Sequence, residues 1–103
     1  MTTPASAPRY RATWRGALIA ASDRTQVVDG YTYFPPEAIV PGRLVAVAHT
    51  SACAWKGTAS YYSVTVDGQV NEDAAWVYPQ PKEAASEIAG HVAFWRGVEV
   101  LPN

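Results

Sequence analysis

Short apolar runs separated by turn residues make up most of this chain. In the run 44–49, Val45, Val47 and His49 share one face of an extended segment, and the intervening residues share the other. The other runs cover residues 17–21, 26–28, 59–78 and 91–101. Several short runs bounded by glycine, proline and aspartate are typical of a β-sandwich or barrel-like domain. The pattern therefore predicts a mainly β fold.

Three dipeptides mark turns between these runs: Asp29-Gly30, Asp67-Gly68 and Arg96-Gly97. Asp-Gly suits a two-residue type I′ turn, because both positions of that turn need a positive φ. Asp29-Gly30 thus predicts a hairpin into the next apolar run, and Asp67-Gly68 predicts the longest hairpin, over 59–78. Arg96-Gly97 predicts a last hairpin within 91–101.

Residues 81–90 (PKEAASEIAG) are the segment with helical signals. Pro81 suits a first turn, Glu83 lies early in the segment, and Gly90 ends the pattern. Ile88 would face the interior. We expect one short α-helix here.

The Asp67-Gly68 hairpin determines which side chains share a face. With a two-residue loop and no bulge, Trp76 lies opposite Ala59. One face then combines aromatic, hydroxyl and carboxylate groups: Tyr61, Ser63, Thr65, Glu72, Trp76 and Tyr78. The other is a plain core face: Tyr62, Val64, Val66 and Val77. The mixed face suits a ligand groove, since pockets combine apolar walls with a few polar groups, and it equally suits a half-exposed sheet.

Length and composition fit a single domain. The 103 residues suffice for one modest core; residues 1–9, rich in Thr, Ala, Ser and Pro, are expected to form a flexible N-terminal tail before a domain at 10–103. The formal net charge of −1 and the scattered basic residues argue against a nucleic-acid partner. No apolar run approaches the roughly 20 residues of a membrane span, and the start lacks an apolar export signal. We expect a cytoplasmic bacterial protein that does not associate with membranes.

Metal and cofactor sites have few candidate ligands in this chain. Cys53 is the only cysteine, which excludes an internal disulfide and zinc sites built from cysteine pairs. The two histidines, His49 and His91, are far apart in sequence. No P-loop, dinucleotide-binding or nucleophile-elbow motif occurs. We therefore expect no metal and no cofactor.

Chemistry-bearing residues are dense between His49 and Ser63 (HTSACAWKGTASYYS). Cys53 is a candidate nucleophile if nearby positive charge stabilises its thiolate, and otherwise a small buried hydrophobe. Lys56, in a tight turn, is a candidate anion-binding group or a solvated surface lysine. His49 is a candidate proton-transfer group or a hydrogen-bonding residue at a strand end.

Four further residues have more ordinary interpretations. His91 follows the helix-ending glycine, where it can interact with the exposed carbonyls of the helix. Trp55 and Trp95 are expected to fill the core or to cover the seam between sheets. Glu72, on the mixed face, could act alone as a base, because the adjacent Asp73 points to the opposite face.

Three motifs carry a resemblance to a known family: CAWKGTASYYSVTVDG, AAWVYPQP and IAGHVAFW. The likeness runs from Trp14 to Val100, and the chain resembles the bacterial and fungal domain of unknown function 427 family. The resemblance implies a β-tent, in which two small antiparallel sheets meet at an angle, as in peptide methionine-R-sulfoxide reductases. Many β-tent proteins hold zinc with two CxxC pairs, which this chain lacks. The family's name assigns no activity.

Three functions remain open. The first is binding of a small molecule, anionic if Lys56 contacts it, in an aromatic groove between sheets. The predicted binding residues are Lys56, Tyr61, Trp76 and Tyr78. The second is an enzyme that uses the thiol of Cys53 with His49 and Lys56. The third is a protein-interaction module without catalysis. The sequence leaves the ligand, the reaction and the oligomeric state open.

Overall fold

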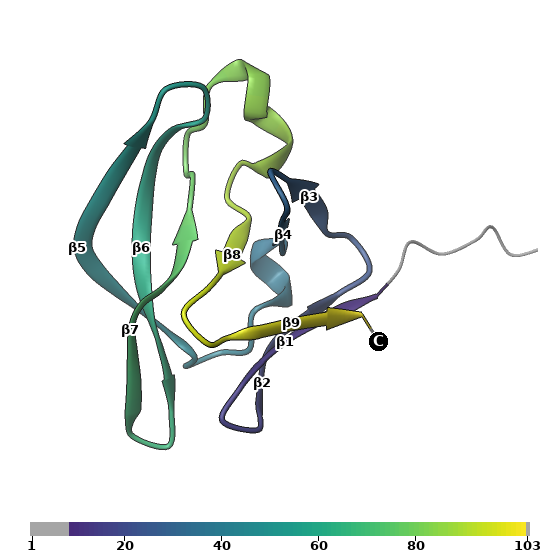
Figure 1. Cartoon of the computed structure of the whole chain (residues 1–103), viewed down its shortest axis with the longest axis vertical. Coiled ribbons are helices and arrows are strands. Elements are labelled where there is room, and N and C mark those ends of the chain that lie inside the picture. The colour runs from purple at the N-terminus through teal and green to yellow at the C-terminus, as the bar shows by residue number, and fades with distance from the viewer. Residues whose placement is uncertain (1–8, 103) are drawn as a thin grey trace, which may run out of the picture.

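The computed structural model describes residues 9–102, which contain nine strands, two short 3-10 segments and no α-helix (Figure 1). The strands are β1 (Tyr10–Trp14), β2 (Ala17–Ser22), β3 (Gln26–Val28), β4 (Tyr31–Tyr33), β5 (Leu44–Cys53), β6 (Gly57–Val66), β7 (Gln69–Val77), β8 (Val92–Phe94) and β9 (Glu99–Pro102). The 3-10 segments are η1 (Pro36–Ala38) and η2 (Glu83–Ile88). The prediction of a mainly β fold is confirmed. The expected tail at 1–9 lies outside the described residues, apart from Arg9.

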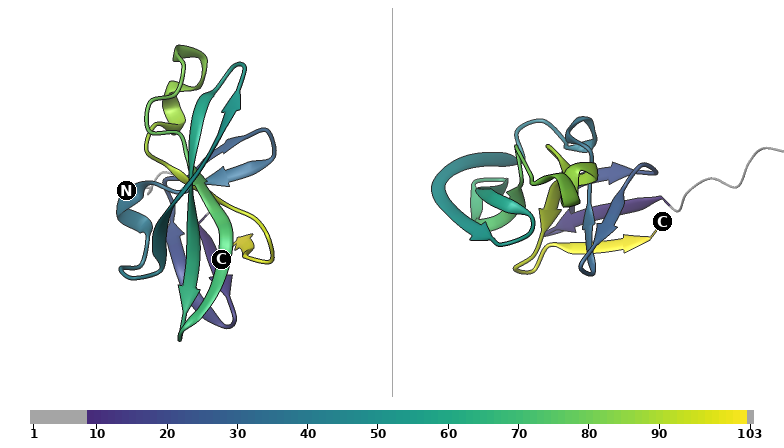
Figure 2. Two further views of the ribbon diagram at one scale, coloured as in Figure 1. Left: turned by 90° about the vertical axis from the view of Figure 1, so that its left-hand side faces the viewer. Right: turned by 90° about the horizontal axis from the view of Figure 1, so that it is seen from above.

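The strands form three antiparallel sheets, where two were expected. Their orders are β2-β1-β9, β3-β4 and β5-β6-β7-β8. In Figure 1 the four-stranded sheet forms the left side, the three-stranded sheet lies at the lower right, and β3 and β4 lie above it. The turned views in Figure 2 show β5 and β6 as long, strongly twisted strands. The hairpin of β3 and β4 stays separate because its strands are only three residues long, and it meets β8 through a single bridge between Phe34 and Val92.

The Asp-Gly turns join paired strands as predicted, but the Arg96-Gly97 turn does not close a hairpin. Asp29-Gly30 and Asp67-Gly68 have positive φ at both positions, and they connect β3 to β4 and β6 to β7. Arg96-Gly97 also has positive φ. However, β8 pairs with β7, and β9 pairs with β1. The prediction of a last hairpin is therefore wrong, because each of these short strands finds a longer partner in a different sheet.

The expected α-helix over 81–90 is also wrong, because this segment forms the 3-10 element η2. The backbone of Ala85 (φ −122°, ψ 24°) leaves the helical region and divides the element. A helix this short gains too few hydrogen bonds to offset its nucleation cost. Tertiary bonds decide the conformation instead, and the N–H of Lys82 donates to the carbonyl of Lys56 at 2.8 Å.

A shift in register changes one predicted pairing in the long hairpin. The pairing of β6 with β7 follows the predicted register near the turn and shifts between Tyr62 and Val64. Beyond the shift, Trp76 lies opposite Tyr61 and not opposite Ala59. Because the displacement is two residues, an even number, the side chains keep their faces.

The four-stranded sheet packs against a hydrophobic cluster on each face. The predicted core face is confirmed, since Val64, Val66 and Val77 are buried in one cluster and Tyr62 packs against it. The second cluster consists of Tyr33, Ala59, Trp76, Tyr78, Ala85, Ile88 and Ala93. The core role expected for Trp55 is wrong: its side chain belongs to neither cluster and is 41% exposed, because it lies in the turn between β5 and β6.

Candidate functional site

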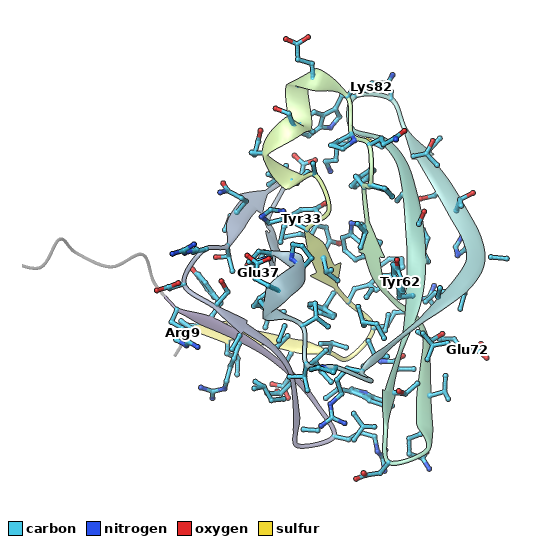
Figure 3. All side chains as sticks on the ribbon, turned by 180° about the vertical axis from the view of Figure 1, so that it is seen from behind. Arg9, Tyr33, Glu37, Tyr62, Glu72 and Lys82 are labelled. Atoms are coloured by element: carbon cyan, nitrogen blue, oxygen red, sulfur yellow. The ribbon has the colours of Figure 1, made fainter. Side chains whose placement is uncertain are left out.

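A pocket of about 170 Å³ lies between β4 and the face of the four-stranded sheet that carries the second cluster. Six aromatic side chains and one lysine line it: Tyr31, Tyr33, Lys56, Tyr61, Trp76, Tyr78 and Trp95. In Figure 3, Tyr33 lies in the interior of the molecule, while Glu72 points outward from its edge. The pocket brings together all four residues that the sequence suggested for ligand binding. We call these seven side chains the aromatic pocket.

Trp76 is the centre of the aromatic pocket. Its ring meets those of Tyr31, Tyr33 and Trp95 edge to face, with centroids 4.8, 6.3 and 5.5 Å away. Its indole N–H donates to the hydroxyl of Tyr33 at 3.2 Å. Edge-to-face contacts add to the energy of burial and fix the rings relative to one another. The pocket walls are therefore held nearly perpendicular to Trp76.

Lys56 brings a positive charge to this apolar site. It is only 8% exposed, and its Nζ forms an ion pair with Oδ2 of Asp29 at 2.6 Å. Burial pulls the pKa of Lys56 down, but the hydrogen bond that its ammonium donates to Asp29, together with the negative charge of Asp29, raises the pKa above its ordinary value. The ammonium is therefore charged at neutral pH.

Two tyrosine hydroxyls lie near this ammonium and stay protonated. Burial raises the pKa of Tyr33 and that of Tyr78. The oxygen of Tyr33 accepts the bond from Trp76, which leaves its own O–H free to donate. Tyr78 makes no side-chain hydrogen bond with the rest of residues 9–102. With the ammonium, these hydroxyls thus give the pocket hydrogen-bond donors among apolar rings.

Comparison with known families decides the assignment of the chain. The family model described as "Domain of unknown function (DUF427)" matches residues 2–101. The chain belongs to the DUF427 family. This confirms the resemblance seen in the sequence motifs. A comparison with curated proteins finds no match.

Cys53 lies at the end of β5 in this DUF427 domain, in the turn that carries Lys56. The backbone N–H of Lys56 and then that of Trp55 bond its sulfur and lower the pKa of the thiol, and the ammonium of Lys56 adds to this effect against the opposing effect of burial. Cys53 is partly buried and packs against the second cluster. Its surroundings therefore favour the thiolate.

We expect iodoacetamide to alkylate Cys53 in the native protein with a midpoint below the free-thiol pKa of about 8.5. The reason is the stabilisation of the thiolate by the two turn amides. Rates measured by mass spectrometry from pH 5 to 9 test this, with a cysteine-containing peptide as the reference. A native midpoint equal to that of the peptide, or labelling only after denaturation, would refute it.

His49 lies in a different cluster from Cys53 and Lys56. Its Nδ1 is 3.2 Å from Oδ2 of Asp73, and its ring stacks on Tyr61 with centroids 4.3 Å apart. Asp73 adopts a positive φ of 55° within β7, and its carbonyl accepts the indole N–H of Trp95. His49 and Asp73 thus contact the pocket-lining Tyr61 and Trp95 without lining the pocket themselves. The structure brings Cys53 together with Lys56 but not with His49.

The structure also tests the expectations for Glu72, Trp95 and His91. Glu72 is exposed and is not among the pocket-lining residues, so its predicted place in a groove is wrong. Trp95 is 36% exposed at the pocket and does not fill the core. His91 bonds the carbonyl of Ala89 through Nδ1 at 2.9 Å, as expected for a residue at the end of a helical segment.

Sequence reasoning missed Tyr31 and Tyr33 as pocket residues and Asp29 as the partner of Lys56. The Asp29-Gly30 turn signal places both tyrosines on one face of a short hairpin, so part of this information was present locally. No local pattern tells which sheet that hairpin packs against. The hairpin packs on the four-stranded sheet through contacts between residues far apart in sequence, so the three residues could not be assigned to the site from sequence.

Residues 9–102 contain neither a metal-binding cluster nor a membrane-spanning helix. No three side chains of the His, Cys, Asp and Glu types lie close enough together to hold a metal ion. Within the same residues, no helix has the length and apolar character needed to span a bilayer.

Proposed function

We propose that this DUF427 domain binds a small molecule, with a flat apolar body and an oxygen acceptor, in the aromatic pocket between its sheets. The observation that carries the proposal is a charged, buried lysine at a cavity whose other walls are all aromatic. Lysine is rarely buried, and a hollow that combines aromatic walls with a few polar groups is typical of a ligand site. An ammonium beside an open space is better explained by a ligand than by stability.

The size of the pocket limits its occupant. A cavity of about 150 Å³ is large enough to hold benzene, and the aromatic pocket measures about 170 Å³. The ligand portion inside is therefore about one ring in size. Perpendicular aromatic walls can contact the face and the edge of such a ring at once.

The donors of the pocket define the polar group of the ligand. An ammonium has three N–H donors, and Lys56 uses one on Asp29. The remaining donors and the O–H of Tyr33 require acceptors, which a carbonyl or carboxylate oxygen provides. The aromatic rings bind the body of the ligand, and the donors fix its orientation.

We further propose that the domain acts in the cytoplasm on a small molecule, without a nucleic-acid or membrane partner, and that its sheets form the β-tent implied by the family resemblance. The formal net charge of −1 and the scattered basic residues support the absence of a nucleic-acid partner. The position of the pocket between β4 and the four-stranded sheet fits a tent whose sheets meet at an angle.

Thiol chemistry at Cys53 is a second candidate function. The two turn amides that bond its sulfur favour it, together with the nearby charge of Lys56. Any redox version needs an external thiol, because the chain has no second cysteine.

Calorimetric titration with benzoate and with benzyl alcohol tests the binding proposal. We expect saturable binding of both and a loss of about 5- to 10-fold in affinity when Trp95→Ala removes one aromatic wall. Trp14→Ala is the matched control, because Trp14 also precedes an Arg-Gly turn but lies in β1, outside the pocket. Failure of both probes to bind, or equal affinities in the two variants, would contradict the proposal.

A further inference from the structure

The buried ammonium of Lys56 has an anionic partner from a different part of the fold. Asp29 comes from the turn between β3 and β4, and its carboxylate reaches Nζ at 2.6 Å. The two partners differ in exposure: the side chain of Lys56 is 10% exposed and that of Asp29 is 51% exposed. Breaking the pair would return Asp29 to water easily, whereas Lys56 would remain buried and unpaired. The lysine therefore always needs an anion, but that anion need not be Asp29.

The element that carries Asp29 is anchored more firmly at its base than at its tip. A two-stranded hairpin with strands of three residues has little stability of its own. It is held to the four-stranded sheet at its base, where Phe34 bridges to Val92 and the buried Tyr33 accepts the indole N–H of Trp76. Nearer the tip, Tyr31 is 41% exposed and contacts Trp76 through its ring. The tip can thus give up the ion pair without disrupting the base.

We infer that the ligand of the aromatic pocket is a monocarboxylate whose carboxylate group takes the place of Asp29 on Lys56. This inference rests on the proposed function. Asp29 then acts as an internal competitor that neutralises the lysine while the pocket is empty.

The charge at the site selects this class of ligand. One carboxylate replaces another, so the buried pair keeps its neutral total charge and its charge-assisted hydrogen bond. A ligand ammonium would face Lys56 and be repelled. A phosphate dianion would leave an excess negative charge in an apolar pocket. The pocket volume of about 170 Å³ leaves room for about one ring, attached to a carboxylate that lies at Lys56.

The experiment compares the wild-type protein with Asp29→Asn. Asp29 has a φ of 53°, and asparagine tolerates this left-handed conformation well, so the variant removes the charge and keeps the turn. We expect benzoate to bind about 5- to 10-fold more tightly to the variant, because its competitor is gone. Benzyl alcohol, which has the same ring without the charge, should bind both proteins equally.

A second background makes the result specific to the ion pair. When Lys56→Met is present, Asp29→Asn should no longer change the affinity for benzoate, because the shared cation is absent. An unchanged or weaker affinity of Asp29→Asn for benzoate would overturn the inference; if benzyl alcohol still binds, the proposed function survives. A gain that persists in the Lys56→Met background would also overturn it. If neither probe binds any of the proteins, the proposed function fails, and the inference fails with it.

Discussion

Trp76→Ala is expected to lower the free energy of unfolding by about 3–5 kcal/mol, the range found when a buried large aromatic side chain is removed. Trp76 is 7% exposed and contacts the rings of Tyr31, Tyr33 and Trp95. Its loss leaves a void that the surrounding rings cannot fill, and it leaves the hydroxyl of Tyr33 without its donor. Urea denaturation followed by far-ultraviolet circular dichroism measures the change.

Trp55→Ala is the matched control for this prediction. Trp55 is largely solvated and contacts Lys56 through its ring face, with Nζ 5.0 Å from the ring centroid. Its removal should cost less than about 1 kcal/mol. Equal losses in the two variants would show that the cluster around Trp76 does not hold β4 against the four-stranded sheet.

Local sequence patterns predicted the elements of this fold better than their partners. The alternation of apolar residues and the Asp-Gly turns identified most of the strands and the long hairpin, because both depend on residues close together in sequence. The first strand, β1, was not predicted. The strands on either side of Arg96-Gly97 were paired wrongly, because their partners β7 and β1 lie elsewhere in the chain. The helical signals at 81–90 were overridden by tertiary bonds and by a break at Ala85.

The residues of the candidate site also separate into those that local sequence patterns predicted and those that only tertiary packing reveals. Tyr61, Trp76 and Tyr78 were grouped correctly because they share one face of one hairpin, and the two-residue shift did not change that face. Tyr31 and Asp29 come from another hairpin, and only the docking of that hairpin on the four-stranded sheet reveals them. The pairing of His49 with Asp73 was missed for a similar reason.

That pairing depends on two irregular strands. The register of β5 against β6 shifts between Ala46 and Thr50, and His49 lies within this shift. Asp73 lies within the corresponding shift in β7, where its φ is positive. Bulges re-aim side chains in ways that a simple alternation of faces does not capture. The pairing of His49 with Asp73 thus depends on the register shifts in β5 and β7, which the sequence pattern did not predict.

Lys56→Met is expected to weaken benzoate binding by about 10- to 100-fold, because a hydrogen bond to a charged group contributes about 1.5–3 kcal/mol. Affinity for benzyl alcohol should change far less, since the aromatic walls remain. Calorimetric titration of both probes gives the comparison, and Lys82→Met is the matched control because the side chain of Lys82 is exposed and lies outside the aromatic pocket. Equal losses for benzoate and benzyl alcohol would mean that the lysine shapes the pocket without recognising the carboxylate.

The stability of Lys56→Met shows whether its effect on binding is separate from an effect on folding. Near neutral pH the free energy of unfolding should change by less than about 1 kcal/mol, because the burial cost of the lysine offsets much of the ion pair and Asp29 is half solvated. The pKa of Lys56 is raised in the folded protein, so the lysine's pH-dependent contribution is fully present below the unfolded-state pKa of about 10.4 and is lost as pH rises through the folded-state value. Wild-type protein should therefore lose stability more steeply than Lys56→Met above about pH 10. Urea denaturation at neutral and at alkaline pH measures this. If the free energy of unfolding fell equally in the two proteins as pH rises, the ammonium would not be held by Asp29.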